Sequence, residues 1–592
     1  MTPMTSDLKT PAYLAKLRHS AEHVLTQAMH NLYGSNKIVM AMGPATGDGF
    51  YFDFDPSTSS GTIKISEGNF PEIEKEMWRI VNKAWPITKK SITVAEARKL
   101  FADNPYKQEW LDEIEQSGEE ATVFWTGDQF VDLCKGPHVE NTSEIKAFKL
   151  LSVAGAYWHG DEKKQMLTRI YGTAFASPED LDKYLWMIEE AKKRDHKKLG
   201  KELDLFTFSD LVGAGLPLWT PKGTLLRNLL DGLVWQLRQE KGYQKVTIPH
   251  ITRRALYEKS GHWAKYADDL FKIKTREGHE FAMKPMNCPH HTQIYAHLPR
   301  SYRDLPQRYA ETTMVYRDEQ TGELSGLSRV RCITQDDAHV FCRETQLEEE
   351  MLAIWDIIEK FYQACGFPEL EVRLSLHDPA QMSKYLGVEA DWQVWEDGLR
   401  RLVAKKKASC VEVPGEAAFY GPKIDFMAHD SLGREWQVAT IQADRNMPKN
   451  FDLVCINEDG VEERIVMVHA AIMGSIERFV SILIEHTAGK FPFWLSPVQV
   501  KILPISEKHL AYAEEVKKKL QESDIRVELD DNNDTLSKEI RNAQREKVPY
   551  MLVLGDKEVE SEQVAIRSRD EGKQEVLKLE EFIKKLKAEN KV

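Results

Sequence analysis

Residues 329–339 constrain the fold of this chain most. They read RVRCITQDDAH, and polar side chains recur at every second position. Successive side chains of a β-strand point to opposite faces, so one face would carry alternate residues of this run. That face would present Arg329, Arg331, Ile333, Gln335, Asp337 and His339. Because a guanidinium donates two parallel hydrogen bonds to phosphate, the run predicts a pocket for a charged ligand. A solvated strand covered by salt bridges is the alternative.

The composition is typical of a globular protein with several domains. A chain of 592 residues is too long for one core, and 42% hydrophobic with 29% charged residues is ordinary for such proteins. We find no apolar run long enough to span a bilayer and no signal pattern at the N-terminus. The seven cysteines are scattered and odd in number, which argues against a disulfide framework and predicts a cytoplasmic location.

The net charge of −13 does not exclude nucleic-acid binding, because phosphate contacts depend on local basic patches rather than on the whole-chain sum. Two such patches lie at residues 192–201 and 405–407. Each is equally consistent with a solvated helix face, and for each patch alone we favour that interpretation.

The pattern of predicted elements divides the chain into a mixed N-terminal region, a charged helix and two further domains. Residues 13–32 have helical spacing of apolar residues, and residues 50–54 form an expected strand. Residues 178–200 predict one charged linking helix. The alternating strands that follow favour an antiparallel sheet in an α+β domain. From residue 497 onward, strands and helices alternate, which predicts a small α/β domain with a largely parallel sheet.

Short motifs in a fixed order indicate a family. They are residues 283–289, 317–319, 329–339, 419–425 and 474–479, and together they resemble bacterial threonyl-tRNA synthetases, which are class II enzymes. The resemblance extends from about residue 12 to the C-terminus. It implies a multidomain α+β fold: an editing domain over 1–177, a helical linker over 178–200, a class II catalytic domain over 201–496 and an anticodon-binding domain over 497–592.

The implied reaction is the ATP-dependent attachment of threonine to tRNA(Thr). The threonine carboxylate would attack the α-phosphate, so catalysis depends mainly on positioning and on charge stabilisation. The resemblance assigns the catalytic role to Arg317, Arg329 and Arg478. It assigns ATP binding, with Mg²⁺, to Arg317, Glu319, Arg329, Ile333, Gln437, Thr440, Ser475 and Arg478.

Three separated residues match the zinc ligands of the family: Cys288, His339 and His469. Their spacing alone does not predict a metal site, and packed side chains are the alternative. A zinc ion that binds the amine and the hydroxyl of threonine would reject valine, which an apolar pocket alone cannot do well. The resemblance places threonine against Met286, Gln335, Asp337, Tyr420 and Gln442. Serine carries the same two groups, so a second, correcting site is expected.

That second site is expected near the N-terminus. His19 and His23 share one helix face, and Cys134 and His138 repeat the spacing. From the residues alone, a zinc site with two ligand pairs and a helix with surface histidines both stay open. The resemblance implies a site that hydrolyses seryl-tRNA, to which Lys107 and Asp132 also belong.

The resemblance also implies macromolecular partners. The tRNA anticodon is assigned to Asn533, Glu560 and Arg569, because unstacked bases expose edges that such side chains can bind. A charged, exposed strand is the alternative there. Residues 241–249 match the element through which class II synthetases form homodimers.

Four features depart from the family pattern. The small ubiquitin-like domain that precedes the editing domain is expected to be missing. His290 replaces a glycine, Ile333 replaces the aromatic residue that stacks on adenine, and Ala470 replaces an arginine. Two rival hypotheses therefore remain: a class II synthetase for another amino acid, such as proline or serine, and a non-catalytic tRNA-binding relative.

Overall fold

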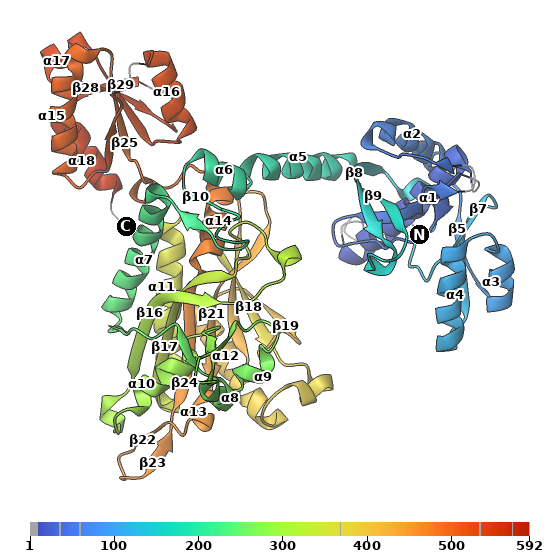
Figure 1. The fold of residues 1–592 in the computed structure, drawn as a ribbon, viewed down its shortest axis with the longest axis horizontal. Helices are drawn as coiled ribbons and strands as arrows, with labels where there is room; N and C mark the ends of the chain where they lie inside the picture. The colour runs from blue at the N-terminus through green and yellow to red at the C-terminus, as the bar shows by residue number, and fades with distance from the viewer. Residues whose placement is uncertain are drawn as a thin grey trace. The chain divides into compact units, whose positions relative to one another are not determined.

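The computed structural model describes residues 10–590, apart from residues 35–36, 59–60, 368, 532–533, 571 and 573. The chain forms two compact units, residues 1–189 and residues 190–592 (Figure 1). The first unit has its own hydrophobic core, and the second holds a large sheet domain and a smaller C-terminal domain. Among the described residues, none of the helices is both long enough and apolar enough to cross a membrane.

Helix α1 organises the first unit. It spans Pro11–Tyr33, and the Thr10 side chain caps it by accepting a hydrogen bond from the backbone of Tyr13. The helix predicted over residues 13–32 is therefore confirmed. Its buried face shares one core with α2 and with the sheet of order β1-β2-β9-β8. The bounds are α2 Phe70–Val81, β1 Val39–Met40, β2 Phe50–Asp55, β8 Ala147–Tyr157 and β9 Met166–Phe175.

A second, three-stranded sheet completes this unit and carries half of its candidate site. Its order is β5-β6-β7, and all neighbours are antiparallel. Strand β7 runs directly into residues 134–138, which brings that loop to α1. The bounds are β5 Ile87–Ile92, β6 Ala121–Thr126, β7 Phe130–Leu133, α3 Val94–Leu100 and α4 Pro105–Ser117.

The charged segment predicted as one helix is two helices. Helix α5 spans Pro178–Arg194 and α6 spans His196–Glu202. Asp195 separates them, because its backbone is non-helical (φ −47°, ψ 119°) and its carboxylate caps α6 at the backbone N–H of Lys197. The division between the two units falls inside α5.

An eight-stranded sheet forms the centre of the second unit. Its order is β12-β16-β17-β24-β21-β20-β18-β19, antiparallel except at the two edge pairs, as expected for an α+β domain. The bounds are β12 Gln244–Lys245, β16 Gln307–Tyr316, β17 Cys332–Cys342, β18 Leu370–Leu376, β19 Cys410–Pro414, β20 Lys423–His429, β21 Glu435–Asp444 and β24 Val466–Ser475.

The two faces of this sheet have different roles. Helices α7 (Pro221–Glu240), α11 (Leu347–Ala364) and α14 (Ile476–Thr487) share a core with one face, to which Val340 and Val468 belong. On the other face, Phe341 and Met467 pack with residues of α10 (Cys288–Ala296) and α13 (Asn446–Asn450). Side chains alternate along β17 and β24, so every second residue packs in the core under α7, α11 and α14. The residues between them point to the face of α10 and α13, where they can reach a ligand.

The face predicted for residues 329–339 holds only in part. Strand β17 begins at Cys332, so Ile333, Gln335, Asp337 and His339 share one face, as the ladder with β16 requires. The predicted extension to Arg329 and Arg331 is wrong, because both precede the strand in a loop. There the two guanidinium groups bind Glu319, Arg329 through the carboxylate and Arg331 through the backbone carbonyl.

The C-terminal domain has a mixed sheet of order β26-β25-β27-β28-β29. The first three strands are mutually parallel, as predicted, but β28 and β29 are antiparallel and fall outside that expectation. The bounds are β25 Val500–Pro504, β26 Val527–Leu529, β27 Tyr550–Leu554, β28 Gln563–Ser568, β29 Gln574–Lys578, α15 Leu510–Gln521, α16 Leu536–Arg545, α17 Asp556–Ser561 and α18 Leu579–Glu589.

Separate cores predict separate unfolding. Leu25 is fully buried on α1, so Leu25→Ala should destabilise the first unit by about 2–5 kcal/mol. Differential scanning calorimetry should show one transition moving to lower temperature while the other stays in place. Lys16→Ala, on the exposed side of the same helix, serves as the matched control. A single transition that moves as a whole would show that the two units unfold together.

Candidate functional site

Three metal-binding side chains meet on the face of the large sheet that packs against α10 and α13. Cys288 begins α10, while His339 and His469 are direct partners in the ladder between β17 and β24. Their donor atoms lie within 4.8 Å of one another, and His339 Nε2 is 3.0 Å from His469 Nδ1. One thiol and two imidazoles are the donor set that zinc prefers, with positions left for a substrate. The three residues therefore fit a zinc ion.

The free ring nitrogens of both histidines have their own partners. His339 Nδ1 lies 2.8 Å from His291 Nδ1, and His469 Nε2 lies 3.1 Å from a carboxylate oxygen of Asp444. Such outer contacts fix the tautomer of a metal ligand and hold its ring in place. Sequence reasoning missed His291 and Asp444, although His291 follows Cys288 closely enough to lie on the same helical turn.

A cavity of about 60 Å³ adjoins the cluster, and Cys288 and His469 form part of its wall. Of the predicted threonine-binding residues, Met286 and Tyr420 line it. The Tyr420 hydroxyl donates to the side-chain carbonyl of Gln442, so Gln442 is held against this wall. The remaining lining residues are not in the predicted set: Ser260, Gly261, His262, Lys265, Tyr266, Leu386, Phe419, Asp444, Asn446, Met447 and Asn450.

Asp337 lies beside the cluster as a buried carboxylate. Its Oδ2 accepts a hydrogen bond of 3.0 Å from Asn287, and its Oδ1 is 3.7 Å from His339 Nε2. Burial raises the pKa of Asp337, while the nearby imidazoles of His291 and His469 oppose that shift. A carboxylate that is buried without a full ion pair is suited to accept an ammonium group from a ligand. Gln335 follows on the same strand face.

The arginines predicted to hold phosphate surround the same end of the sheet. Arg317 follows β16, where its Nη2 is 3.3 Å from the Met286 sulfur and its buried Nε has no hydrogen-bond partner. Arg329 forms a 2.7 Å ion pair with Glu319, which brings two predicted ATP residues together. Arg478 lies exposed in the first turn of α14, where Ser475 caps the helix. An arginine with an unused buried donor is prepared for an anion.

Asp425 joins two further predicted ATP residues. Its Oδ1 accepts hydrogen bonds from Gln437 (2.8 Å) and Thr440 (2.9 Å), and its Oδ2 accepts from Ser375 (2.7 Å) and from Lys423. The network fixes Gln437 and Thr440 on β21. Asp425 was not among the predicted site residues, although it ends the motif at residues 419–425 and the strand period places it beside them.

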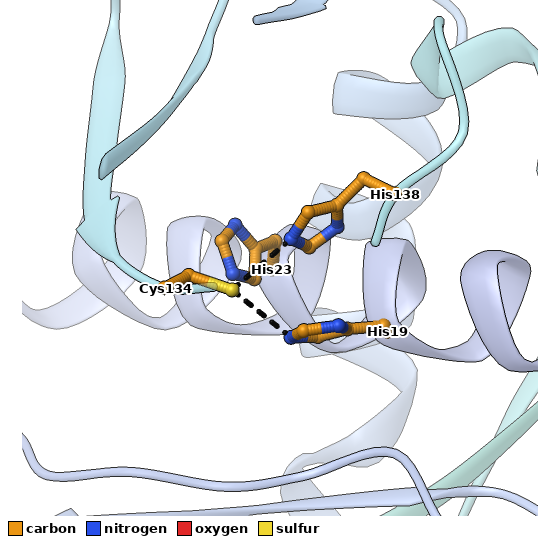
Figure 2. A group of neighbouring side chains, drawn as sticks. All are labelled: His19, His23, Cys134 and His138. Carbon is orange, nitrogen blue, oxygen red and sulfur yellow. Dashed lines mark hydrogen bonds between the residues drawn. The ribbon is translucent and has the colours of Figure 1, made fainter. Parts of the chain in front are cut away.

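The second candidate site lies in the first unit, beside a cavity of about 710 Å³. Figure 2 shows His19 and His23 on α1 pointing toward Cys134 and His138 of the loop after β7. The Cys134 sulfur is 3.2 Å from Nε2 of His19 and 3.2 Å from Nε2 of His138. The alternative of separate surface histidines is therefore wrong, because His23 is buried and all four side chains form one cluster.

Burial sets the protonation of this cluster. It lowers the pKa of His19, His23 and His138, and it raises the pKa of Cys134 to about 12. The imidazoles are consequently neutral, and the thiol keeps its proton. The group could accept a proton from water, or it could hold a metal ion, since all four donor atoms lie within 4.8 Å of one another.

Charged residues complete the wall of this cavity. Lys107 and Asp132, both predicted, form a buried ion pair of 2.6 Å. Glu22, which was not predicted, lies between the two histidines of α1, 3.7 Å from His19 Nε2 and 3.8 Å from His23 Nε2. Burial, and secondarily Asp132, raises the pKa of Glu22. The helical spacing of His19 and His23 could have indicated Glu22, because it lies on the same buried turn.

The two described residues predicted to bind the anticodon have different surroundings. Glu560 is exposed on α17, while Arg569 is turned inward and donates to the backbone carbonyls of Lys547 (2.9 Å) and Phe491 (3.2 Å). Asn533 lies outside the described residues. The basic patch at residues 405–407 is partly neutralised, since Lys406 pairs with Asp356 and Glu359 at 2.8 Å each. That patch is better interpreted as a solvated helix face.

Comparison with known proteins supports each part of this arrangement. Residues 271–487 match the family described as "tRNA synthetase class II core domain (G, H, P, S and T)", and residues 499–589 match "Anticodon binding domain". Residues 122–171 match "Threonyl and Alanyl tRNA synthetase second additional domain".

Whole-chain relatives agree with the family matches. The threonine–tRNA ligase of Porphyromonas gingivalis is 48% identical over 96% of this chain and 87% of its own length. That of Phocaeicola vulgatus is 47% identical over 96% and 88%. A solved RNA-binding domain of the Cryptosporidium parvum threonyl-tRNA synthetase is 38% identical, with a TM-score of 0.63, over 67% of this chain and 98% of that one. The resemblance drawn from the sequence motifs is thereby confirmed, and the chain belongs to the family of threonine–tRNA ligases.

Proposed function

We propose that this chain activates L-threonine with ATP, transfers it to tRNA(Thr) and removes serine from mischarged tRNA. The observation that carries the choice of amino acid is the convergence of Cys288, His339 and His469 beside Asp337. Among class II synthetases, a set of three metal-binding residues beside a buried carboxylate argues against a purely apolar or purely hydrogen-bonding amino-acid pocket. A ligase for proline or serine is therefore the less suitable alternative.

In the activation step, an oxygen of the threonine carboxylate forms a bond with the α-phosphorus of ATP. The bond from that phosphorus to the bridging oxygen breaks, and pyrophosphate leaves with both electrons. No proton has to move, so the protein contributes orientation and charge. Arg317 would neutralise the α-phosphate, and Arg329 and Arg478 the β- and γ-phosphates. Mg²⁺, as expected for ATP chemistry in class II enzymes, would offset the remaining charge.

Selection of threonine would depend on the metal cluster and on Asp337. A zinc ion bound by Cys288, His339 and His469 would offer open coordination positions that suit a ligand with both an amine and a hydroxyl. Asp337 would accept a hydrogen bond from an N–H of the same amine, and Asn287 keeps that carboxylate in place. Tyr420 and Gln442 close the wall beside the substrate methyl group. Valine loses the hydroxyl contact and is rejected, whereas serine keeps both contacts.

In the transfer step, a ribose hydroxyl at the 3′ end of the tRNA attacks the carbonyl carbon of the threonyl group. The bond from that carbon to the phosphate oxygen breaks, and AMP leaves, with the hydroxyl proton passing to a phosphate oxygen. The C-terminal domain would hold the anticodon, with the exposed Glu560 more accessible to a base than the internally bonded Arg569. We further propose a homodimer formed through residues 241–249. A cytoplasmic location is supported by seven cysteines that are all free thiols.

In the editing step, water attacks the carbonyl carbon of the seryl ester. The bond from that carbon to the ribose oxygen breaks, and the ribose oxygen takes a proton as it leaves. The imidazoles of His19 and His23 are unprotonated and can accept the proton of the attacking water. Burial lowers the pKa of His23 further than that of His19, so His19 is the stronger base of the two. Lys107, held by Asp132, places one positive charge in the cavity where the carbonyl oxygen becomes negative.

The metal assignment predicts one zinc ion per chain. Removing one of three ligands by His339→Ala should abolish stoichiometric zinc, because the remaining thiol and imidazole cannot hold the ion tightly. Elemental analysis of the purified variants measures this. His23→Ala, which removes a histidine of the other cluster, should retain all of the zinc. Zinc lost from His23→Ala but kept in His339→Ala would move the metal to the N-terminal unit.

The adenine assignment predicts a gain of affinity. Ile333 has no aromatic face, and stacking on a base is worth roughly 1–3 kcal/mol, so recovery of the lower value, about 1 kcal/mol, by Ile333→Phe should lower the KM for ATP by about 5-fold. Steady-state pyrophosphate exchange measures the change. Ile333→Val, which adds no aromatic face, should not produce it. An unchanged KM in Ile333→Phe would show that this side chain does not lie against the adenine ring.

The editing assignment predicts two separable activities. The His19→Ala/His23→Ala double variant should lose deacylation of pre-formed seryl-tRNA by about 10²–10⁴-fold, because general-base catalysis contributes that much. Threonine activation should stay near the wild-type rate, since the two sites lie in units with separate cores. His30→Ala, in the last turn of the same helix, is the control. Equal deacylation by wild type and double variant would remove the histidines from the reaction.

A further inference from the structure

A bulge interrupts the ladder between the two strands that carry the metal-binding histidines. Gln335 of β17 pairs with Ser475 of β24, but Asp337 pairs with Ala471, so β24 contains two residues more than β17 between these pairs. Backbone N–H groups at a bulge lose their partners on the neighbouring strand. Since this part of the sheet is buried, those groups need another acceptor.

The carboxylate of Asp336 supplies that acceptor. Its Oδ2 accepts from the backbone of Ile472 at 2.9 Å, and its Oδ1 accepts from Met473 at 3.1 Å. Asp336 is fully buried on the face of β17 opposite to Asp337 and His339. Burial raises the pKa of Asp336 to about 7, and Arg238 is the first influence that opposes the shift. The bulge therefore depends on a carboxylate that needs a nearby cation.

Arg238 of α7 provides the cation. Its side chain is only 3% exposed, and its Nη2 is 3.0 Å from the Asp336 carbonyl oxygen, 3.3 Å from Asp336 Oδ2 and 3.4 Å from the Ala470 carbonyl oxygen. One guanidinium nitrogen thus joins β17 and β24 on the face of the sheet that α7, α11 and α14 cover, which we call the rear face. The contact at Ala470 is adjacent to His469, and the contact at Asp336 is adjacent to Asp337.

Position 470 lies on the same face of the sheet as the Arg238 guanidinium. Ala470 is buried and pairs with Ala338 in the ladder. Ala470, Ala338 and the residues of α7 share the core on the rear face of the sheet. A longer side chain at position 470 would extend into the region that the Arg238 guanidinium occupies.

We propose that Arg238 is a positioning residue of the synthetic site, and that an arginine side chain placed at position 470, on the same face of the sheet, would hold the Asp336 carboxylate in its stead. It never touches the substrate. By holding Asp336, it fixes the bulge, the pairing of His339 with His469 and the path of β24 to Ser475 and Arg478. The inference rests on the proposed function, because the residues it positions are those assigned to threonine and ATP.

The test exchanges the arginine between the two positions. Pyrophosphate exchange with threonine is measured for wild type, Arg238→Met, Ala470→Arg and the double variant, each below its own melting temperature. Arg238→Met should lower kcat by about 10- to 100-fold, because small displacements of catalytic groups have effects of that size. Ala470→Arg should also be impaired, since it adds a second buried cation to one carboxylate. The double variant should recover to within about threefold of wild type.

A matched variant separates positioning from stability. Arg308→Met removes another arginine that binds a buried carboxylate, that of Glu350, at 2.6 and 2.7 Å. It should lower the melting temperature without lowering kcat. If Arg238→Met behaves in the same way, Arg238 supports only the fold and the proposal is overturned.

The double variant tests whether an arginine at position 470 can replace Arg238. A double variant no more active than Arg238→Met, or insoluble like it, would show that position 470 cannot replace Arg238. If Arg238→Met alone is insoluble, a soluble and active double variant still supports the proposal. Failure of the wild-type protein to catalyse exchange with threonine would contradict the proposed function itself, and is distinguishable from either result.

Discussion

The register between β17 and β24 is the constraint on which the synthetic site depends. It makes His339 and His469 direct partners, so two ligands from segments 130 residues apart meet without a flexible loop. The same register places Asp337 beside the cluster on one face and Asp336 on the opposite face. Because side chains alternate strictly along a strand, a shift of one residue would bury the histidines in the rear core and expose the packing residues.

The two sites use burial in opposite ways. In the synthetic site, two buried charged side chains have incomplete partners. Arg317 keeps an unused buried donor, which an anionic nucleotide can complete, and Asp337 lacks a full ion pair, so it can accept a hydrogen bond from the substrate amine. The editing site is assembled mainly from neutral donors, because burial lowers the pKa of its histidines and raises that of Cys134. The first arrangement suits phosphate chemistry, and the second suits proton transfer from water.

Sequence reasoning reached the residues that a motif or a period marks. The spacing of apolar residues predicted α1, and the alternation at 333–339 predicted the pocket face of β17. It failed where the outcome depends on tertiary contact. Arg329 and Arg331 were placed on the strand because nothing local shows that β17 begins at Cys332. Asp444 was missed because its role comes from His469, a partner supplied by folding. Glu22 and His291 were missed although helical spacing places them beside predicted site residues.

The bulge shows the same limit most clearly. The contact of Arg238 with the Ala470 carbonyl could not be inferred, since the two residues are separated by 232 positions in the chain. A covering helix, a buried carboxylate and a carbonyl on a third segment must all be in place before that contact exists. Such a contact leaves no mark on the local sequence pattern.

Pyrophosphate exchange with a panel of amino acids tests the central claim most directly, namely that the metal-binding cluster and Asp337 select threonine. The account predicts strong exchange with threonine, weaker but measurable exchange with serine, and very little with valine or proline. Chelation of the metal should abolish exchange with threonine and serine together. Exchange with valine comparable to that with threonine, or undiminished exchange after the metal is removed, would contradict the account.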